Sequence, residues 1–198
     1  MERLILARHG ESVYSVRGLV NGDPSVDVGL TPAGEEQARE LGRGLAGEPL
    51  DVCVVSTLRR TRATAEAALD GRPVPIEELP DFGDPRAGRF EGLPLDDYRA
   101  WAWSAGSAED APGGGESRRA IVARYAAAYR AQLGRPEAVV LAVLHALPIA
   151  YVLDALDGSP PAPRMRRTIE YARPYPLDAA ELRGALDVID AWREEPTW

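Results

Sequence analysis

The chain contains only two histidines, and each follows a short apolar run. His9 comes after residues 4–7 and His145 after residues 138–144, and such runs are typical of buried β-strands. Ligands of open α/β sheets bind in the crevice outside the carboxyl ends of the strands. A neutral imidazole there can act as a nucleophile, and the guanidinium of Arg8 suits phosphate oxygens. These residues predict a site for a phosphate-like anion. The alternatives are that Arg8 lies at an exposed strand end and that each histidine is a core residue whose hydrogen bonds are made within the protein.

A cluster of arginines follows a further apolar run. Residues 50–55 are typical of a strand, and the segment from residue 56 onward is typical of a helix. The N-terminus of a helix after a strand favours anions, because its free N–H groups and its dipole both attract negative charge. Arg59, Arg60 and Arg62 lie in or near the first turns, where an arginine either binds the anion or belongs to a solvated face.

Five stretches resemble the signatures of the histidine phosphatase (phosphoglycerate mutase-like) superfamily. Arg-His-Gly-Glu-Ser at residues 8–12 resembles the first signature, and Ser-x-Leu-x-Arg-x-x-x-Thr-Ala at 56–65 resembles the second. The third stretch is 84–92, which contains an acidic residue, a glycine, an aromatic residue and Glu-Gly at the family's spacing. The fourth is Gly-Gly-Gly-Glu-Ser at 113–117, and the fifth is His145. From the order and spacing of these stretches, the chain is identified as a member of this superfamily.

The resemblance implies a role for each matching residue. His9 would attack phosphorus to give a phosphohistidine, and Asp84 would protonate the departing oxygen. Arg8, Arg60 and His145 would donate hydrogen bonds to the phosphate oxygens, with no metal and no cofactor. Phosphoryl transfer needs mainly positioning and charge neutralisation, which these residue types can supply.

The general acid has competitors in the same segment. Asp84 is one methylene shorter than the glutamate that many members of the superfamily carry, and Asp81 and Glu91 lie nearby. We predict Asp84 as the acid, with Asp81 and Glu91 as alternatives. All three carboxylates could instead cap turns.

Three positions depart from the family pattern. Ser15 stands where an asparagine is usual, Ala146 stands where a glycine is usual, and Pro85 stands where mutases of the family typically have arginine. A hydroxyl at Ser15 can still donate to phosphate, and so can the backbone N–H of Ala146 if its φ is negative. We therefore keep Ser15 and Ala146 as candidate phosphate-binding residues.

Alternating strands and helices predict a three-layer α/β/α sandwich with a mostly parallel central sheet, of the phosphoglycerate mutase-like kind. We expect one histidine phosphatase domain over residues 1–198, with a cap or insertion over the active site around residues 85–115. Aromatic side chains in that insertion could face a bulky leaving group or form a small core of their own; they are Tyr98, Trp101 and Trp103.

Local signals predict further elements. Residues 13–29 are rich in Gly, Pro, Asp and Ser and are expected to form a loop. Thr31 is expected to cap the helix that follows it. Residues 166–171 are predicted as an edge strand, and Asp178 with Glu181 as the capping box of the last helix.

The composition excludes several classes of function. The formal net charge of −8 argues against nucleic acid as a partner, although all 23 basic side chains are arginine. No apolar run approaches the ~20 residues that span a bilayer, and the N-terminus lacks a signal-peptide pattern. The single cysteine, Cys53, lies in an apolar run and is expected to be buried in a reducing compartment. We therefore expect a cytoplasmic protein.

The function that fits these features best is a phosphomonoesterase acting on a small phosphorylated metabolite. One alternative is a cofactor-dependent mutase, in which Arg86, Arg118 or Arg119 could hold a second acidic group. A third is a non-catalytic module that binds phosphoesters, suggested only by the departures from the family pattern at Ser15, Asp84 and Ala146. Composition and motifs leave the substrate and the oligomeric state open.

Overall fold

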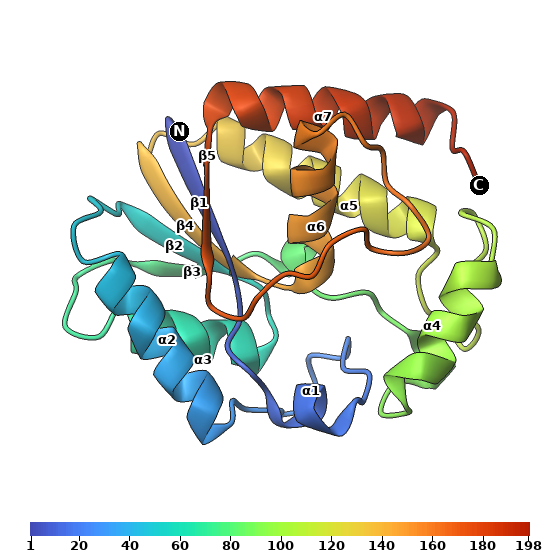
Figure 1. Ribbon diagram of the computed structural model, residues 1–198, viewed down its shortest axis with the longest axis horizontal. Coiled ribbons are helices and arrows are strands. Elements are labelled where there is room, and N and C mark those ends of the chain that lie inside the picture. Colours follow the sequence, from blue (N-terminus) through green and yellow to red (C-terminus); the bar gives the residue numbers. More distant parts are fainter.

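The computed structural model describes residues 1–198 and is built on a five-stranded sheet of order β3-β2-β4-β1-β5 (Figure 1). The first four strands in the chain run parallel, and β5 pairs antiparallel with β1 at the edge. The predicted mostly parallel sheet is therefore confirmed. The strands are β1 (Arg3–Arg8), β2 (Val52–Val55), β3 (Ile76–Glu78), β4 (Val139–Leu144) and β5 (Pro174–Asp178).

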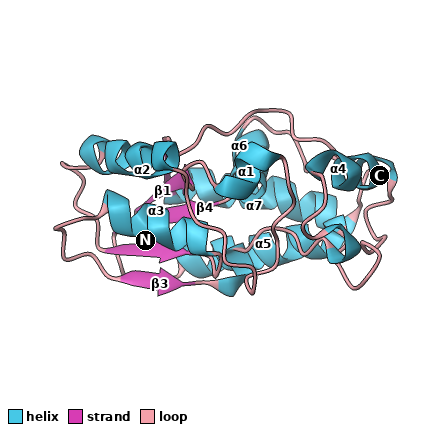
Figure 2. Cartoon of the chain, turned by 90° about the horizontal axis from the view of Figure 1, so that it is seen from below, coloured by secondary structure: helices cyan, strands magenta, loops and turns pink.

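Helices cover both faces of the sheet, as a three-layer sandwich requires (Figure 1). One face carries α2 (Pro32–Gly44) and α3 (Arg59–Ala68), and the other carries α5 (Arg118–Leu133), α6 (Ala146–Leu156) and α7 (Ala179–Glu194). Two shorter helices, α1 (Val13–Arg17) and α4 (Leu95–Ser104), lie beyond the strand ends, and Figure 2 shows the arrow of β3 pointing toward the side that carries α4. Single 3-10 turns occupy Pro80–Phe82 and Gly88–Phe90.

The apolar runs are buried on both sides of the sheet. Leu4 and Leu6 of β1 belong to the larger core cluster with α5, α6 and α7, whereas Ile5 and Ala7 belong to the cluster with α2 and α3. Successive side chains of a strand point to opposite faces, so a central strand must be apolar at every position. Cys53 lies in the second cluster and is fully buried, as expected.

The predicted helix caps are confirmed. The Thr31 side chain accepts a hydrogen bond from the backbone N–H of Gly34, at the start of α2. Asp178 and Glu181 form a reciprocal capping box at the start of α7. None of the helices has the length and apolar character needed to cross a membrane.

Two local predictions are wrong. The segment 13–29 is not all loop, because Ser12 caps α1 and Gly18 ends this five-residue helix in the left-handed conformation. The edge strand is β5 (Pro174–Asp178), whereas segment 166–171 makes only one bridge, between Tyr171 and Arg8. Prolines at positions 174 and 176 suggest a loop, but an edge strand tolerates a missing N–H on its solvent side.

Candidate active site

A cavity of about 810 Å³ opens beyond the carboxyl ends of the strands. Six of the predicted site residues line it: Arg8, His9, Ser15, Arg60, Asp84 and Ala146. The seventh, His145, lies beneath the lining; its ring centroid is 5.3 Å from that of His9, and Arg60 contacts both rings. Residues from four of the five family stretches, together with Ser15 and Ala146, are thus brought together in one place.

The His9 imidazole is held in a defined tautomer at the end of β1. Its Nδ1 lies 2.7 Å from the carbonyl oxygen of Gly10. A carbonyl can only accept, so Nδ1 carries the proton and Nε2 keeps its lone pair, toward which Arg60 Nε lies at 3.2 Å. Burial, together with the neighbouring Arg60 and His145, holds the pKa of His9 well below its ordinary value. His9 is therefore held neutral, with the lone pair of Nε2 on the side of Arg60.

The turn after His9 is fixed by two helices. The backbone N–H of Gly10 donates to Thr64 Oγ1 of α3 at 2.9 Å. On the other side, a Cβ placed on Gly10 would lie 2.3 Å from the backbone oxygen of Gly34 in α2. Only glycine permits this backbone approach, so the position of His9 depends on α2 and α3.

Arg60 connects the groups of the site. It is 4% exposed, and its guanidinium donates to Asn21 Oδ1 at 2.5 Å and to Asp84 Oδ2 at 2.6 Å. It also reaches His145 Nδ1 at 3.2 Å. Arg59 points to the exposed Asp27, so the arginine that faces the cavity is Arg60. Asn21 was not predicted, because a single asparagine in a turn-rich loop carries no signal of its partner.

Asp84 is the one carboxylate of the three candidates that lines the cavity. Its Oδ2 lies 3.4 Å from His145 Nδ1 in addition to its contact with Arg60. Glu91 instead accepts backbone N–H groups from two loops, so its carboxylate braces the structure. Asp81 is exposed outside the lining residues.

His145 follows β4 and is completely buried. Its Nδ1 accepts from Arg60, because a guanidinium can only donate, so Nε2–H donates to Ser56 Oγ at 2.8 Å. Burial and then the nearby Arg60 hold the pKa of His145 well below its ordinary value. Both histidines are therefore held in the neutral form.

Arg8 is positioned by a segment distant in the chain. Its guanidinium donates to the carbonyl of Ile169 at 2.9 Å and stacks over the Tyr171 ring at 3.9 Å. The Arg8 Nε is buried without a hydrogen-bond partner, and a bound oxyanion could accept from it. The contribution of Tyr171 was missed, since its segment was predicted as a strand.

Ser15 and Ala146 both line the cavity, and each is positioned by the helix to which it belongs. Ser15 Oγ lies 2.8 Å from Ser12 Oγ within the capped turn of α1. Ala146 is the first residue of α6, and its φ is negative, because Ala172 is the only non-glycine residue with a positive φ. The Ala146 N–H can therefore point to an anion without backbone strain.

The aromatic side chains of α4 were predicted either to face the leaving group or to form a small core, and the structure shows some of each. Tyr98 packs with Phe90 in a small core, and Trp101 packs against this core. Tyr98 also lines the cavity. Trp103 is 41% exposed at the cavity rim, where Arg164 stacks over its ring at 4.2 Å.

Comparison with known proteins agrees with the geometry. A model of the histidine phosphatase superfamily (branch 1) matches residues 4–189. The chain belongs to the histidine phosphatase superfamily. The resemblance given by the motifs is thereby confirmed over nearly the whole chain.

Relatives in this superfamily include mutases and phosphatases. The chain is 30% identical to a 2,3-bisphosphoglycerate-dependent phosphoglycerate mutase of Brucella ovis, over 95% of this chain and 98% of the relative. It is 35% identical to uncharacterized phosphatase PhoE of Bacillus subtilis, but that match covers only 49% of each chain. A mutase of Thermobifida fusca matches at 50% identity over 35% of this chain and 28% of the relative.

Solved histidine phosphatase structures share the fold. The α-ribazole phosphatase of Shigella flexneri superposes with a TM-score of 0.73 at 28% identity, covering 89% of this chain and 90% of the other. A mycobacterial glucosyl-3-phosphoglycerate phosphatase, solved with VO3, gives a TM-score of 0.71 at 25% identity over 89% and 91% of the two chains.

Proposed function

We propose that this protein is a phosphomonoesterase that hydrolyses a small phosphate ester through a phosphohistidine on His9. The observation that carries the proposal is the state of His9. Its Nδ1 proton is held by the Gly10 carbonyl, and its neutral Nε2 lies beside Arg60 in a cavity of about 810 Å³. Such a nitrogen is available to attack phosphorus without prior loss of a proton.

The proposed reaction has two in-line steps. His9 Nε2 forms a bond to phosphorus while the bond from phosphorus to the ester oxygen breaks, and Asp84 gives that oxygen a proton. In the second step Asp84 takes a proton from water, whose oxygen attacks phosphorus as the bond to His9 breaks. Arg8 and Arg60 donate to the phosphoryl oxygens throughout, and His145 joins them when its Nδ1 takes up a proton, so the proposed route uses no metal and no cofactor.

Substrate binding in this proposal rearranges one ion pair. In this structure Asp84 Oδ2 accepts from Arg60 at 2.6 Å. A phosphoryl group bound to Arg60 and Arg8 takes the place of that carboxylate, which leaves Asp84 free to take up a proton from solvent and carry it to the departing oxygen. Ser15 and the Ala146 N–H complete the phosphate site in this proposal, and segment 85–115 acts as its cap.

The relatives support hydrolysis and also supply a second candidate. Both solved structures compared above bear the names of phosphatases. The Brucella ovis mutase, however, aligns with 95% of this chain, so phosphotransfer between two positions of one substrate is the second candidate. Binding without catalysis would not require a histidine held in the tautomer of a nucleophile with a carboxylic acid close by.

The test measures hydrolysis of p-nitrophenyl phosphate in EDTA by wild type and His9→Ala. We expect metal-independent turnover that the variant loses, and an acid-labile phosphoenzyme in rapidly quenched wild type. Turnover that persists in His9→Ala would overturn the proposed mechanism. If wild type is inactive, a mutase assay with and without a bisphosphate primer separates the mutase, which turns over only when primed, from the binding module.

A further inference from the structure

The lining of the cavity is rich in arginine although the chain as a whole is acidic. Its lining includes seven arginines but only two carboxylates, Asp84 and Asp96, whereas the net charge of the chain is −8. A cleft lined mainly by positive side chains attracts an anionic ligand, even when the protein as a whole is acidic. The arginines are Arg8, Arg60, Arg99, Arg118, Arg164, Arg166 and Arg167.

The phosphoryl site accounts for two of these arginines, and most of the others have partners. Arg99 pairs with Asp96, and Arg166 and Arg167 lie within ion-pair distance of Asp154. The exposed Arg164 stacks on Trp103. Arg118 is the exception, since it is only partly exposed and makes no ion pair.

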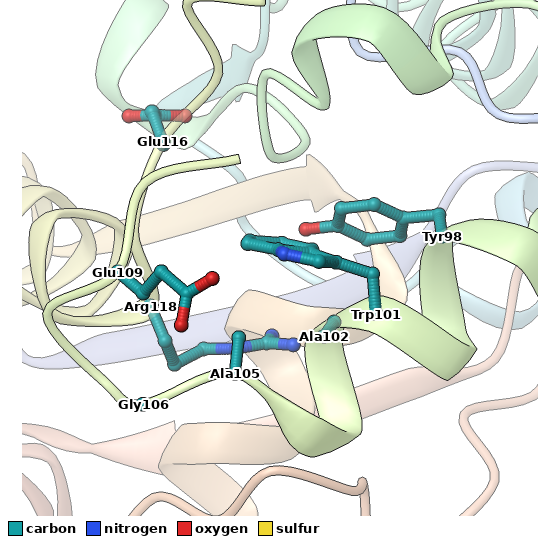
Figure 3. Close-up of a pocket in the computed structure, with 8 residues that line it drawn as sticks. All are labelled: Tyr98, Trp101, Ala102, Ala105, Gly106, Glu109, Glu116 and Arg118. Carbon is teal, nitrogen blue, oxygen red and sulfur yellow. The ribbon is translucent and has the colours of Figure 1, made fainter. Parts of the chain in front are cut away.

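Arg118 occupies an enclosed place between α5 and α4. Its guanidinium donates to the hydroxyl of Tyr151 at 3.1 Å, and Figure 3 shows its side chain reaching toward Trp101 and Ala102 of α4. The nearest acids do not neutralise it. Glu116 is held by Arg124 at 2.9 Å and points away from Arg118 (Figure 3), and Glu109 forms no ion pair with Arg118.

A partly buried cation without a counter-ion is costly unless a ligand supplies the charge. We propose that Arg118 binds a second anionic group of the substrate, a carboxylate or a second phosphate, while the scissile phosphoryl group lies at His9. This inference rests on the proposed phosphatase function and adds the class of substrate. The guanidinium fork favours a planar or multi-oxygen anion.

The second group reaches Arg118 from the main cavity. The hollow behind Arg118, between α4 and residues 105–118, has a volume of about 10 Å³, which leaves room for no more than about one water molecule. Arg118 also lines the cavity of about 810 Å³ that contains His9 and Asp84. A single substrate can therefore span both sites.

The neighbouring arginines provide a matched control. Arg86, one of the other arginines considered for a second acidic group, is 70% exposed and pairs with Glu116. Arg119 follows Arg118 directly, is exposed, and does not line the cavity. Arg119→Gln therefore changes the net charge as Arg118→Gln does, without changing the proposed site.

The test uses phosphonates, which bind without being hydrolysed. Dissociation constants are measured by calorimetry for ω-phosphonocarboxylates of increasing length and for the matching ω-phosphonoamides. A second series ending in another phosphonate distinguishes a carboxylate site from a phosphate site. We expect wild type to prefer the anionic end about tenfold or more at one length, as a charge-assisted hydrogen bond predicts. Arg118→Gln should lose most of this preference, and Arg119→Gln should keep it.

Two results would overturn the inference: no preference at any length in wild type, or a preference retained in Arg118→Gln. If Arg118→Gln binds neither ligand of a pair, Arg118→Met, which keeps an unbranched side chain without the charge, is used, and a preference equal to that of wild type overturns the inference. Turnover of p-nitrophenyl phosphate is measured on the same wild-type sample. An active enzyme without the preference defeats only this inference, whereas an inactive protein defeats the proposed function.

Discussion

At the scale of single residues, Asp84 and Asp81 have the same side chain three positions apart, but only Asp84 lies in the cavity, 2.6 Å from Arg60. We predict that Asp84→Asn lowers kcat by ~10²–10⁴ for an alkyl phosphate, because the departing alkoxide needs a proton. The loss should be much smaller for p-nitrophenyl phosphate, whose leaving group is stable as an anion. Steady-state kinetics with both substrates measures the difference.

Asp81→Asn is the matched control for this prediction. The exposed Asp81 carboxylate is outside the lining residues, so both substrates should turn over as in wild type. An equal loss on both substrates in Asp84→Asn would contradict the role of general acid. It would instead indicate a carboxylate that only positions Arg60.

His145 gives a prediction about stability and pH. Burial and Arg60 lower its pKa in the folded state, whereas the unfolded chain has a pKa of about 6.5. Below about pH 6.5 the unfolded state binds more protons, so stability falls as the pH falls and rises as the pH rises through this window. When the pH is lowered from 7.5 to 5.5, the free energy of unfolding of wild type should fall. The fall should be smaller in His145→Gln, by up to ~1.4 kcal/mol.

Urea denaturation at the two pH values measures this difference. Glutamine can still donate to Ser56, the partner of His145 Nε2, so the variant keeps one buried hydrogen bond. The same pH dependence in variant and wild type would mean that His145 is not held neutral in the folded protein.

At the scale of elements, the turn that carries His9 crosses the first turn of α2. A Cβ on Gly34 would lie 2.0 Å from the backbone oxygen of Glu11. We predict that Gly34→Ala lowers the free energy of unfolding by ~1–3 kcal/mol and also lowers kcat, because the turn must move with its histidine. Gly34 itself does not line the cavity, so the lost activity comes from displacement.

Gly44→Ala in the same helix is the control. A Cβ there meets nothing within 4 Å, so the change should stabilise α2 by ~0.4–1 kcal/mol and leave turnover intact. Thermal denaturation and turnover of p-nitrophenyl phosphate measure both variants. The proposed coupling between α2 and His9 is wrong if Gly34→Ala destabilises the protein without lowering kcat.

The elements also explain how far prediction from sequence could go. Central strands and capped helices are local patterns, so β1, β4 and the box at Asp178 could be predicted. The edge strand β5 could not, because its place depends on pairing with β1, 170 residues earlier, while its prolines suggest a loop. The site follows the same rule: motif order identified His9 and Arg60, but no local signal places Tyr171 under Arg8.

At the scale of the whole molecule, seven arginines line the cavity of a chain that carries a net charge of −8. The cavity should attract anions, and salt should screen that attraction, since the Debye length falls from ~30 Å at 0.01 M to ~3 Å at 1 M. We predict that kcat/KM for p-nitrophenyl phosphate falls several-fold, up to about tenfold, between 0.02 M and 0.5 M salt. The change should appear mainly in KM, because a bound phosphoryl group is already paired.

Two single variants separate the field of the cavity from a general effect of salt. Arg164 is exposed at the cavity rim, and Arg183 is exposed on α7, outside the cavity lining. Both Arg164→Gln and Arg183→Gln remove one positive charge from the molecule. Arg164→Gln should reduce the dependence of KM on salt, and Arg183→Gln should leave it as in wild type. An equal reduction in both variants would mean that substrate responds to the net charge of the protein rather than to the arginines around its site.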